Sequence, residues 1–145
     1  MPTLNRWLTG AALGVIVSVM LAEVAIALLA LASGSDPLLA ALAHPEVAAT
    51  TRPASIAVIW MIAAAGGSAL ACGWCGQPTA AIPAAVVPAA SLMLVVWYFA
   101  QPALVGALVV AGPLIGSACG CALAMSLQRR DRADEAGAAE RGPEI

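Results

Sequence analysis

The chain has 145 residues, of which 62% are hydrophobic and only 10% are charged, and its mean hydropathy is +0.95. Soluble domains are about half apolar and about one quarter charged, so this composition excludes an ordinary soluble domain and indicates an integral membrane protein. The net charge of −2 says nothing about partners. The basic cluster at residues 129–132 is interrupted by Asp131 and follows an apolar run, which disfavours nucleic-acid binding.

Four apolar runs predict four transmembrane helices, over about residues 7–33, 54–75, 80–100 and 103–127. Each run is long enough to cross a hydrocarbon core of about 30 Å, and lipid leaves no alternative to a helix for such segments. Short connections between the later runs predict antiparallel hairpins. The predicted fold is therefore an all-α four-helix transmembrane bundle over residues 1–128.

The segments outside these runs have their own patterns. Asp36 and Pro37 suit the cap and first turn of a short interfacial helix that ends near His44. Residues 129–145 are charged and lack an apolar face, so we expect a disordered cytoplasmic tail. A cleaved secretory signal is the alternative for the first run, but that run exceeds the usual length of about 7–15 apolar residues and contains an acid.

Arginines near the ends of the runs predict the orientation. Arg6 precedes the first run, whereas Arg129, Arg130 and Arg132 follow the last, and Arg52 stands alone in the first loop. Because positive residues concentrate on the cytoplasmic side, we expect both termini in the cytoplasm of a bacterial inner membrane.

Small residues at four-residue spacing form stripes on three of the runs. Such stripes allow helix backbones to approach closely, which matters in lipid because the hydrophobic effect does not drive helices together. The residues predicted to pack helices are Gly10, Gly14, Ser18, Gly67, Gly112, Gly116 and Gly120. The spacing predicts tight packing and leaves open whether it occurs within one chain or between chains.

Glu23 is the strongest candidate for function, because an ionisable residue in the apolar phase rarely faces lipid. It lies about 160° around the helix from the stripe that contains Gly14 and Ser18, at about 100° per residue. Two opposite faces of this helix should therefore avoid lipid, and we expect the helix to be central or sandwiched. Glu23 is either a proton or cation site or a protonated, hydrogen-bonded structural residue.

The stretch Leu21-Ala22-Glu23-Val24, in the first of four spans, resembles the first helix of the small multidrug resistance exporters. The match covers four residues. It implies an antiparallel dimer in which the membrane Glu alternates between binding protons and cationic drugs.

Four cysteines lie at similar depth in the second and fourth runs. Cys72 and Cys75 form a Cys-x-x-Cys motif, but the motif closes a helix, with Gly76 as a C-cap, whereas a thioredoxin-type dithiol begins one. Cys119 and Cys121 point to opposite sides of their helix, so at most one can join the motif. We expect passive packing thiols; the alternative is a soft-metal patch of Cys72, Cys75 and Cys119.

These patterns predict a non-catalytic structural or accessory membrane subunit that packs through its small-residue stripes. Its partners would be the lipid bilayer and either further copies of itself or a larger membrane complex. No hydrolytic triad, phosphate loop or paired membrane carboxylate is present, so we expect no enzymatic activity and no cofactor. The alternative is a small proton- or cation-coupled transporter that uses Glu23.

Overall fold

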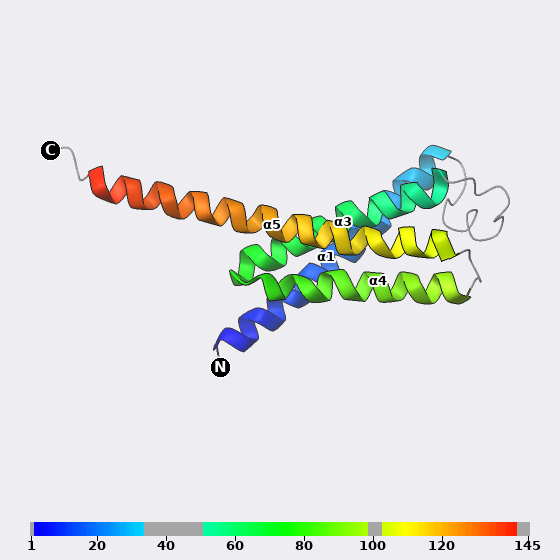
Figure 1. Cartoon of the computed structure of the whole chain (residues 1–145), viewed down its shortest axis with the longest axis horizontal. Coiled ribbons are helices and arrows are strands. Elements are labelled where there is room, and N and C mark those ends of the chain that lie inside the picture. The colour runs from blue at the N-terminus through cyan, green and yellow to red at the C-terminus, as the bar shows by residue number, and fades with distance from the viewer. Residues whose placement is uncertain (1, 34–50, 99–102, 142–145) are drawn as a thin grey trace.

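The computed structural model describes residues 2–33, 51–98 and 103–141, and this part of the chain is helical apart from one short turn. Its helices are α1 (Pro2–Ser33), α3 (Thr51–Cys75), the 3-10 turn η1 (Pro78–Ala80), α4 (Ala81–Tyr98) and α5 (Ala103–Arg141) (Figure 1). Each of the four long helices contains a stretch long and apolar enough to cross a membrane, in agreement with the four predicted apolar runs. The predicted interfacial helix lies outside the described residues.

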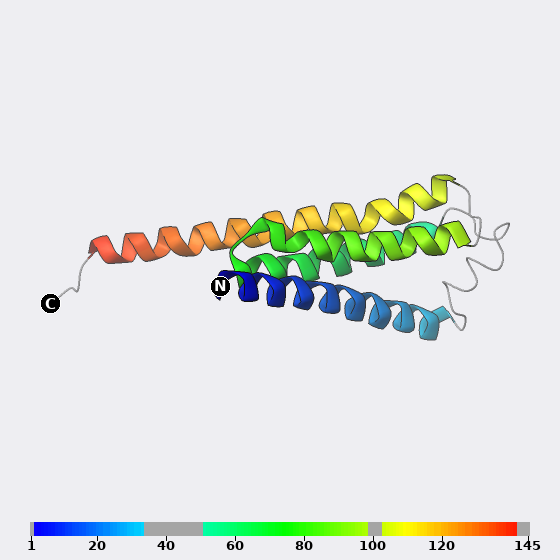
Figure 2. The ribbon, with the colours of Figure 1, turned by 90° about the horizontal axis from the view of Figure 1, so that it is seen from below.

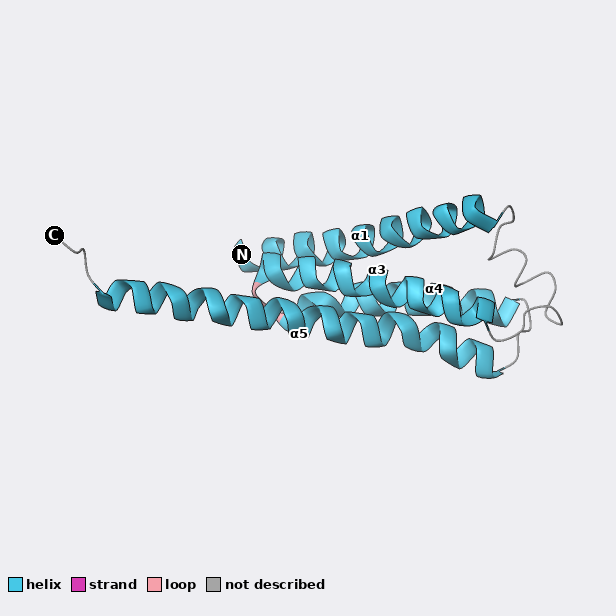
Figure 3. Ribbon diagram, turned by 90° about the horizontal axis from the view of Figure 1, so that it is seen from above, coloured by secondary structure: helices cyan, strands magenta, loops and turns pink. Residues whose placement is uncertain are grey.

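The four helices form an elongated bundle in which α1 and α4 run in one direction and α3 and α5 in the other (Figures 1 and 2). The N-terminal end of α1 and the C-terminal end of α5 lie at the same end of the bundle. Viewed from above, α1 lies along one side and α5 along the other (Figure 3). Helix α3 makes the two most extensive helix contacts of the bundle, with α5 and with α1, so it is the element against which both of these helices pack.

Helices α3 and α5 run parallel with their backbones in contact. Three glycines of α5, each one turn apart, lie against three carbonyl groups of α3. The pairs are Gly112 with Ala57, Gly116 with Met61 and Gly120 with Ala65. A Cβ atom on Gly116 or Gly120 would overlap the facing carbonyl oxygen, so glycine is required for this approach.

Helix α1 packs on another face of α3 in the opposite direction. A Cβ atom on Gly67 of α3 would overlap the Gly14 carbonyl oxygen and the Ser18 hydroxyl oxygen of α1. Ser18 is fully buried and donates to the Gly14 carbonyl at 2.8 Å, so its hydroxyl is satisfied within its own helix. A Cβ atom on Gly10 would overlap the Cys75 sulfur. The structure therefore places the small-residue stripes at contacts within one chain.

The C-terminal segment departs from the prediction. Residues 129–145 were expected to be disordered, but α5 continues without a break to Arg141. The expectation rested on the missing apolar face and overlooked helix propensity, which is high for the Ala, Arg and Glu residues that dominate this segment. Because the membrane part of α5 already supplies the nucleus, each further residue only extends an existing helix.

The backbone contact at Gly116 makes a specific prediction about stability. Gly116→Ala should lower the free energy of unfolding by about 1–3 kcal/mol, because the new methyl group overlaps the Met61 carbonyl oxygen. Gly73→Ala is the matched control: a Cβ atom there meets nothing within 4 Å, and replacing a helical glycine should be neutral or slightly stabilising. Unfolding of both variants in mild detergent measures the difference, and equal stabilities would contradict the proposed contact.

Candidate functional site

Glu23 lies on the outer face of α1, directed away from the bundle. Its side chain is exposed, and so are those of Ile16 and Met20 on the same face, at 54% and 65%. Ala22, the residue before Glu23, is fully buried against the other helices. We expected other helices to cover two opposite faces of α1. Within the single chain they cover only one, because α1 lies at the side of the bundle (Figure 3). Glu23 lies within the candidate span Leu4–Leu28.

The exposed face of α1 has the spacing of a helix-pairing seam. Thr9, Ala12, Ile16, Val19 and Glu23 follow one another at alternating three- and four-residue intervals, and all five are exposed. This spacing keeps one narrow stripe facing a partner helix in left-handed pairs. We call these five residues the outer seam of α1.

The C-terminal end of α3 is held by side chains from α1 and α5. The last carbonyls of a helix have no partner within it and need one from outside. Arg6 of α1 donates to the Trp74 carbonyl at 2.9 Å, and Gln128 of α5 donates to the Gly73 carbonyl at 3.1 Å. Gly76, with φ of 70°, donates its N–H to the Cys72 carbonyl, which confirms the predicted glycine C-cap.

A polar seam lies where α3, α5 and the start of α4 meet. Ser68 of α3 donates to Ser117 of α5 at 2.7 Å, and Ser117 donates to the Ala81 carbonyl at 3.3 Å. One turn further along, the Cys72 thiol donates to the Cys121 sulfur, with the two sulfurs 2.8 Å apart. In each pair the two residues are 49 positions apart in the sequence. The two parallel helices therefore place serine opposite serine and, one turn later, cysteine opposite cysteine.

The structure brings only part of the predicted thiol patch together. Cys72 meets Cys121, whereas the prediction named Cys119, which is exposed on another side of α5. Cys75 turns toward α1, where its thiol donates to the Arg6 carbonyl at 3.2 Å. Sequence reasoning missed the actual pair, although the repeated spacing Ser68-x-x-x-Cys72 and Ser117-x-x-x-Cys121 was a signal for it.

The described residues do not assemble a metal site, because no three His, Cys, Asp or Glu side chains among them gather closely enough to hold an ion. The soft-metal interpretation required three thiols at one point. In the structure the thiols of the Cys-x-x-Cys motif contact different helices, Cys72 toward α5 and Cys75 toward α1.

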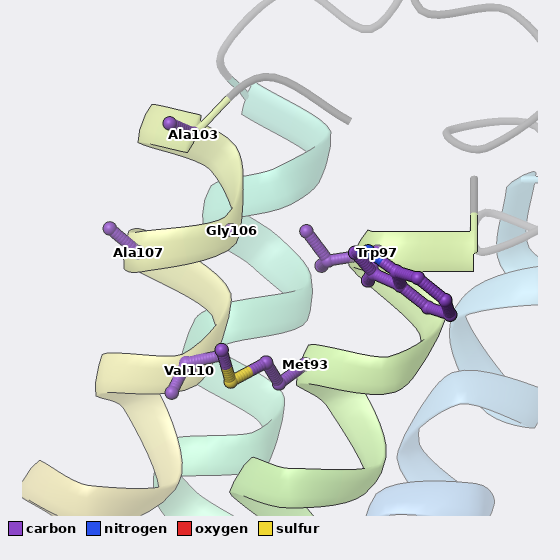
Figure 4. A pocket seen from close by; sticks show the side chains of 7 residues that line it. Met93, Trp97, Ala103, Gly106, Ala107 and Val110 are labelled. Atoms are coloured by element: carbon purple, nitrogen blue, oxygen red, sulfur yellow. The ribbon is translucent and has the colours of Figure 1, made fainter. Parts of the chain in front are cut away.

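The surface carries shallow cavities that Glu23 does not line. One of about 400 Å³ lies between α4 and α5, where Met93 reaches toward Val110 and where Gly106 and Ala107 form the α5 wall (Figure 4). A second, of about 480 Å³, lies between the same two helices nearer η1, and Cys121 forms part of its wall. Both linings are predominantly apolar, so they favour apolar molecules over charged ones.

No family model, curated protein or solved structure matches this chain.

Proposed function

We propose that this chain is a non-catalytic structural subunit of a membrane assembly, and that it self-associates through the outer seam of α1. The observation that carries the proposal is the exposure of Glu23 within a candidate span. An acidic residue facing lipid costs about 2.5–3.5 kcal/mol on insertion scales, with larger values from other methods. A helix that covers this face removes Glu23 from lipid and removes most of that cost.

A second copy of the chain is the occupant that the residues favour. A protonated carboxyl group carries one donor and remaining acceptor capacity, so two Glu23 side chains that face each other satisfy each other. Pairing of this kind needs no basic residue in the membrane. The arginines whose side chains are described are Arg6, Arg129, Arg130 and Arg132. Arg6 and Gln128, which precedes Arg129, bond carbonyls at the C-terminal end of α3, so these arginines lie toward that end and far along α1 from Glu23.

The internal packing supports the same surface. The small-residue stripes contact neighbouring helices of the same chain, so they are not free to bind a partner. The outer seam of α1 lies opposite its stripe and remains uncovered. A symmetric dimer that places the two outer seams together is isologous, the commonest arrangement of homo-oligomers.

The proposal includes a place in the cell. We propose a bacterial inner membrane with both termini in the cytoplasm. The start of α1 and the end of α5 share one end of the bundle (Figure 1). Arg6 and Gln128, which precedes Arg129, both bond carbonyls at the C-terminal end of α3, so arginines of α1 and α5 gather on one side, which supports this orientation.

The central test is the oligomeric state of Glu23 variants in mild detergent. Glu23→Leu should weaken the dimer about 10-fold in Kd, because the interhelical hydrogen bonds, worth about 1–2 kcal/mol in lipid, are lost. Glu23→Gln should keep the dimer, because an amide also donates and accepts. Sedimentation equilibrium or native mass spectrometry gives the dissociation constants.

The control replaces an exposed apolar residue elsewhere. Leu94 of α4 is 65% exposed and lies outside the outer seam, so Leu94→Ala should leave the dimer unchanged. A monomeric wild-type chain, or a Glu23→Leu variant that dimerises as tightly as wild type, would contradict the proposal.

A second candidate is a proton-coupled exporter of small cations, of the small multidrug resistance type. The exposure of Glu23 favours it, because a dimer would enclose the carboxyl groups between two chains. The core weighs against it. Trp60 is packed with Ala22, Leu92 and Val109, so its ring does not lie on the Glu23 face, where a lipophilic cation would need aromatic contacts.

Proton release separates the two functions. If the chain is an exporter, adding tetraphenylphosphonium to the chain in lipid vesicles should release protons from the wild type and not from Glu23→Gln. The structural subunit that we favour should release none in either case. A dye-based pH measurement decides between them, because Glu23→Gln keeps the hydrogen bonds of a dimer but cannot exchange a proton.

A further inference from the structure

We infer that Cys72 and Cys121 are an oxidisable dithiol, which a lipid-soluble quinone reaches through the cavity between α4 and α5 and converts to a disulfide that joins α3 to α5. The inference is independent of the dimer proposed above, because both thiols belong to one chain.

The position of the two sulfurs carries the inference. They are 2.8 Å apart, closer than the sum of two sulfur van der Waals radii, so the two thiols are in direct contact. Both sulfurs also lie near the Pro78 carbonyl oxygen, at 3.9 Å from Cys72 and 4.0 Å from Cys121, so the two thiols face the same backbone group of η1. Cys72 is fully buried, so a reagent must reach Cys121 first.

The cavity beside Cys121 determines which oxidants reach the pair. It has a volume of about 480 Å³ and lies between α4 and α5, both of which are candidate spans. Pro78, Ala81, Leu114 and Met125 contribute to its wall beside Cys121, and the lining is mainly apolar. An apolar cavity that opens between membrane helices admits uncharged, lipid-soluble molecules, and a quinone is such a molecule that accepts two electrons and two protons.

The chemistry balances with a quinone as the oxidant. The S–H bonds of Cys72 and Cys121 break and one S–S bond forms. The two thiol hydrogens, with their two electrons, pass to the two quinone oxygens, and the quinone becomes a hydroquinone. Cys121 faces the cavity and is the thiol that reacts first, whereas Cys72 lies behind it and completes the disulfide.

The positions of the other two cysteines, Cys75 and Cys119, keep them out of this disulfide. The Cys75 thiol is engaged with the Arg6 carbonyl of α1, at 3.2 Å. Cys119 is exposed on α5 and is not in the wall of the cavity that contains Cys121. The expected disulfide is therefore Cys72–Cys121, in preference to the Cys72–Cys75 bond that the Cys-x-x-Cys motif suggests.

The test oxidises the full-length chain in lipid nanodiscs and maps its disulfides. The probe is tetramethyl-1,4-benzoquinone, in which every free ring carbon carries a methyl group, so that simple addition of a thiol to the ring is blocked. After excess maleimide labels the remaining thiols under denaturing conditions, peptide mass spectrometry should find Cys72 linked to Cys121 and label on Cys75 and Cys119. The intact mass should lack two maleimide groups relative to the reduced chain.

Two matched variants identify the pair. Cys119→Ser should keep the quinone-dependent link, whereas Cys121→Ser should lose it, and circular dichroism checks that both remain helical. The wild-type peptide map stands alone if a variant fails to fold. A chain that stays fully reduced, a Cys72–Cys75 bond, or a link between two chains through Cys119 would each overturn the inference.

Discussion

The bundle depends on direct contact between helix backbones on two faces of α3. Glycines of α5 lie against α3 carbonyl groups on one face, and Gly14 and Ser18 of α1 lie against Gly67 on another. In lipid, apolar side chains gain nothing by leaving the solvent, so dispersion contacts at close range must hold the helices together. Residues without a bulky side chain make these contacts possible, which explains why the small residues recur every four positions.

Because the small-residue stripes are used within one chain, they determine which helix surfaces stay free to contact another chain. Stripes that could have paired two chains are occupied within one, and α1, at the side of the bundle, keeps its opposite face uncovered. Glu23 lies on that face and requires a hydrogen-bonding partner that the described helices do not supply at its position. The same close approach of α3 and α5 brings Ser68 to Ser117 and Cys72 to Cys121. The proposed assembly through α1 and the proposed thiol chemistry between α3 and α5 thus depend on the same packing of small residues.

Much of the fold could be predicted because apolar length and four-residue spacing are local properties. The four spans and the Gly76 cap follow from such patterns. Glu23 shows the limit: spacing gives its angle to the stripe, but not whether another helix lies there. The partner of Cys72 is Cys121, whereas the sequence suggested Cys119. Which of the two faces Cys72 depends on the rotation of α5 about its axis, and the glycine contacts with α3 set that rotation. The helical end of α5 was not predicted, because the prediction assumed that a helix there needs an apolar face. High helix propensity is sufficient for a segment that extends an existing helix.

The central claim is that two copies meet at the outer seam of α1, and cross-linking tests it most directly. In a chain whose four native cysteines are replaced by alanine, one cysteine is introduced at Ile16 in the seam or at Leu94 on α4, both exposed positions. After oxidation with copper phenanthroline in native-like membranes, the chain with Ile16→Cys should run as a covalent dimer and the chain with Leu94→Cys as a monomer. A Leu94→Cys dimer with no link at Ile16→Cys would place the interface on α4 and contradict the account.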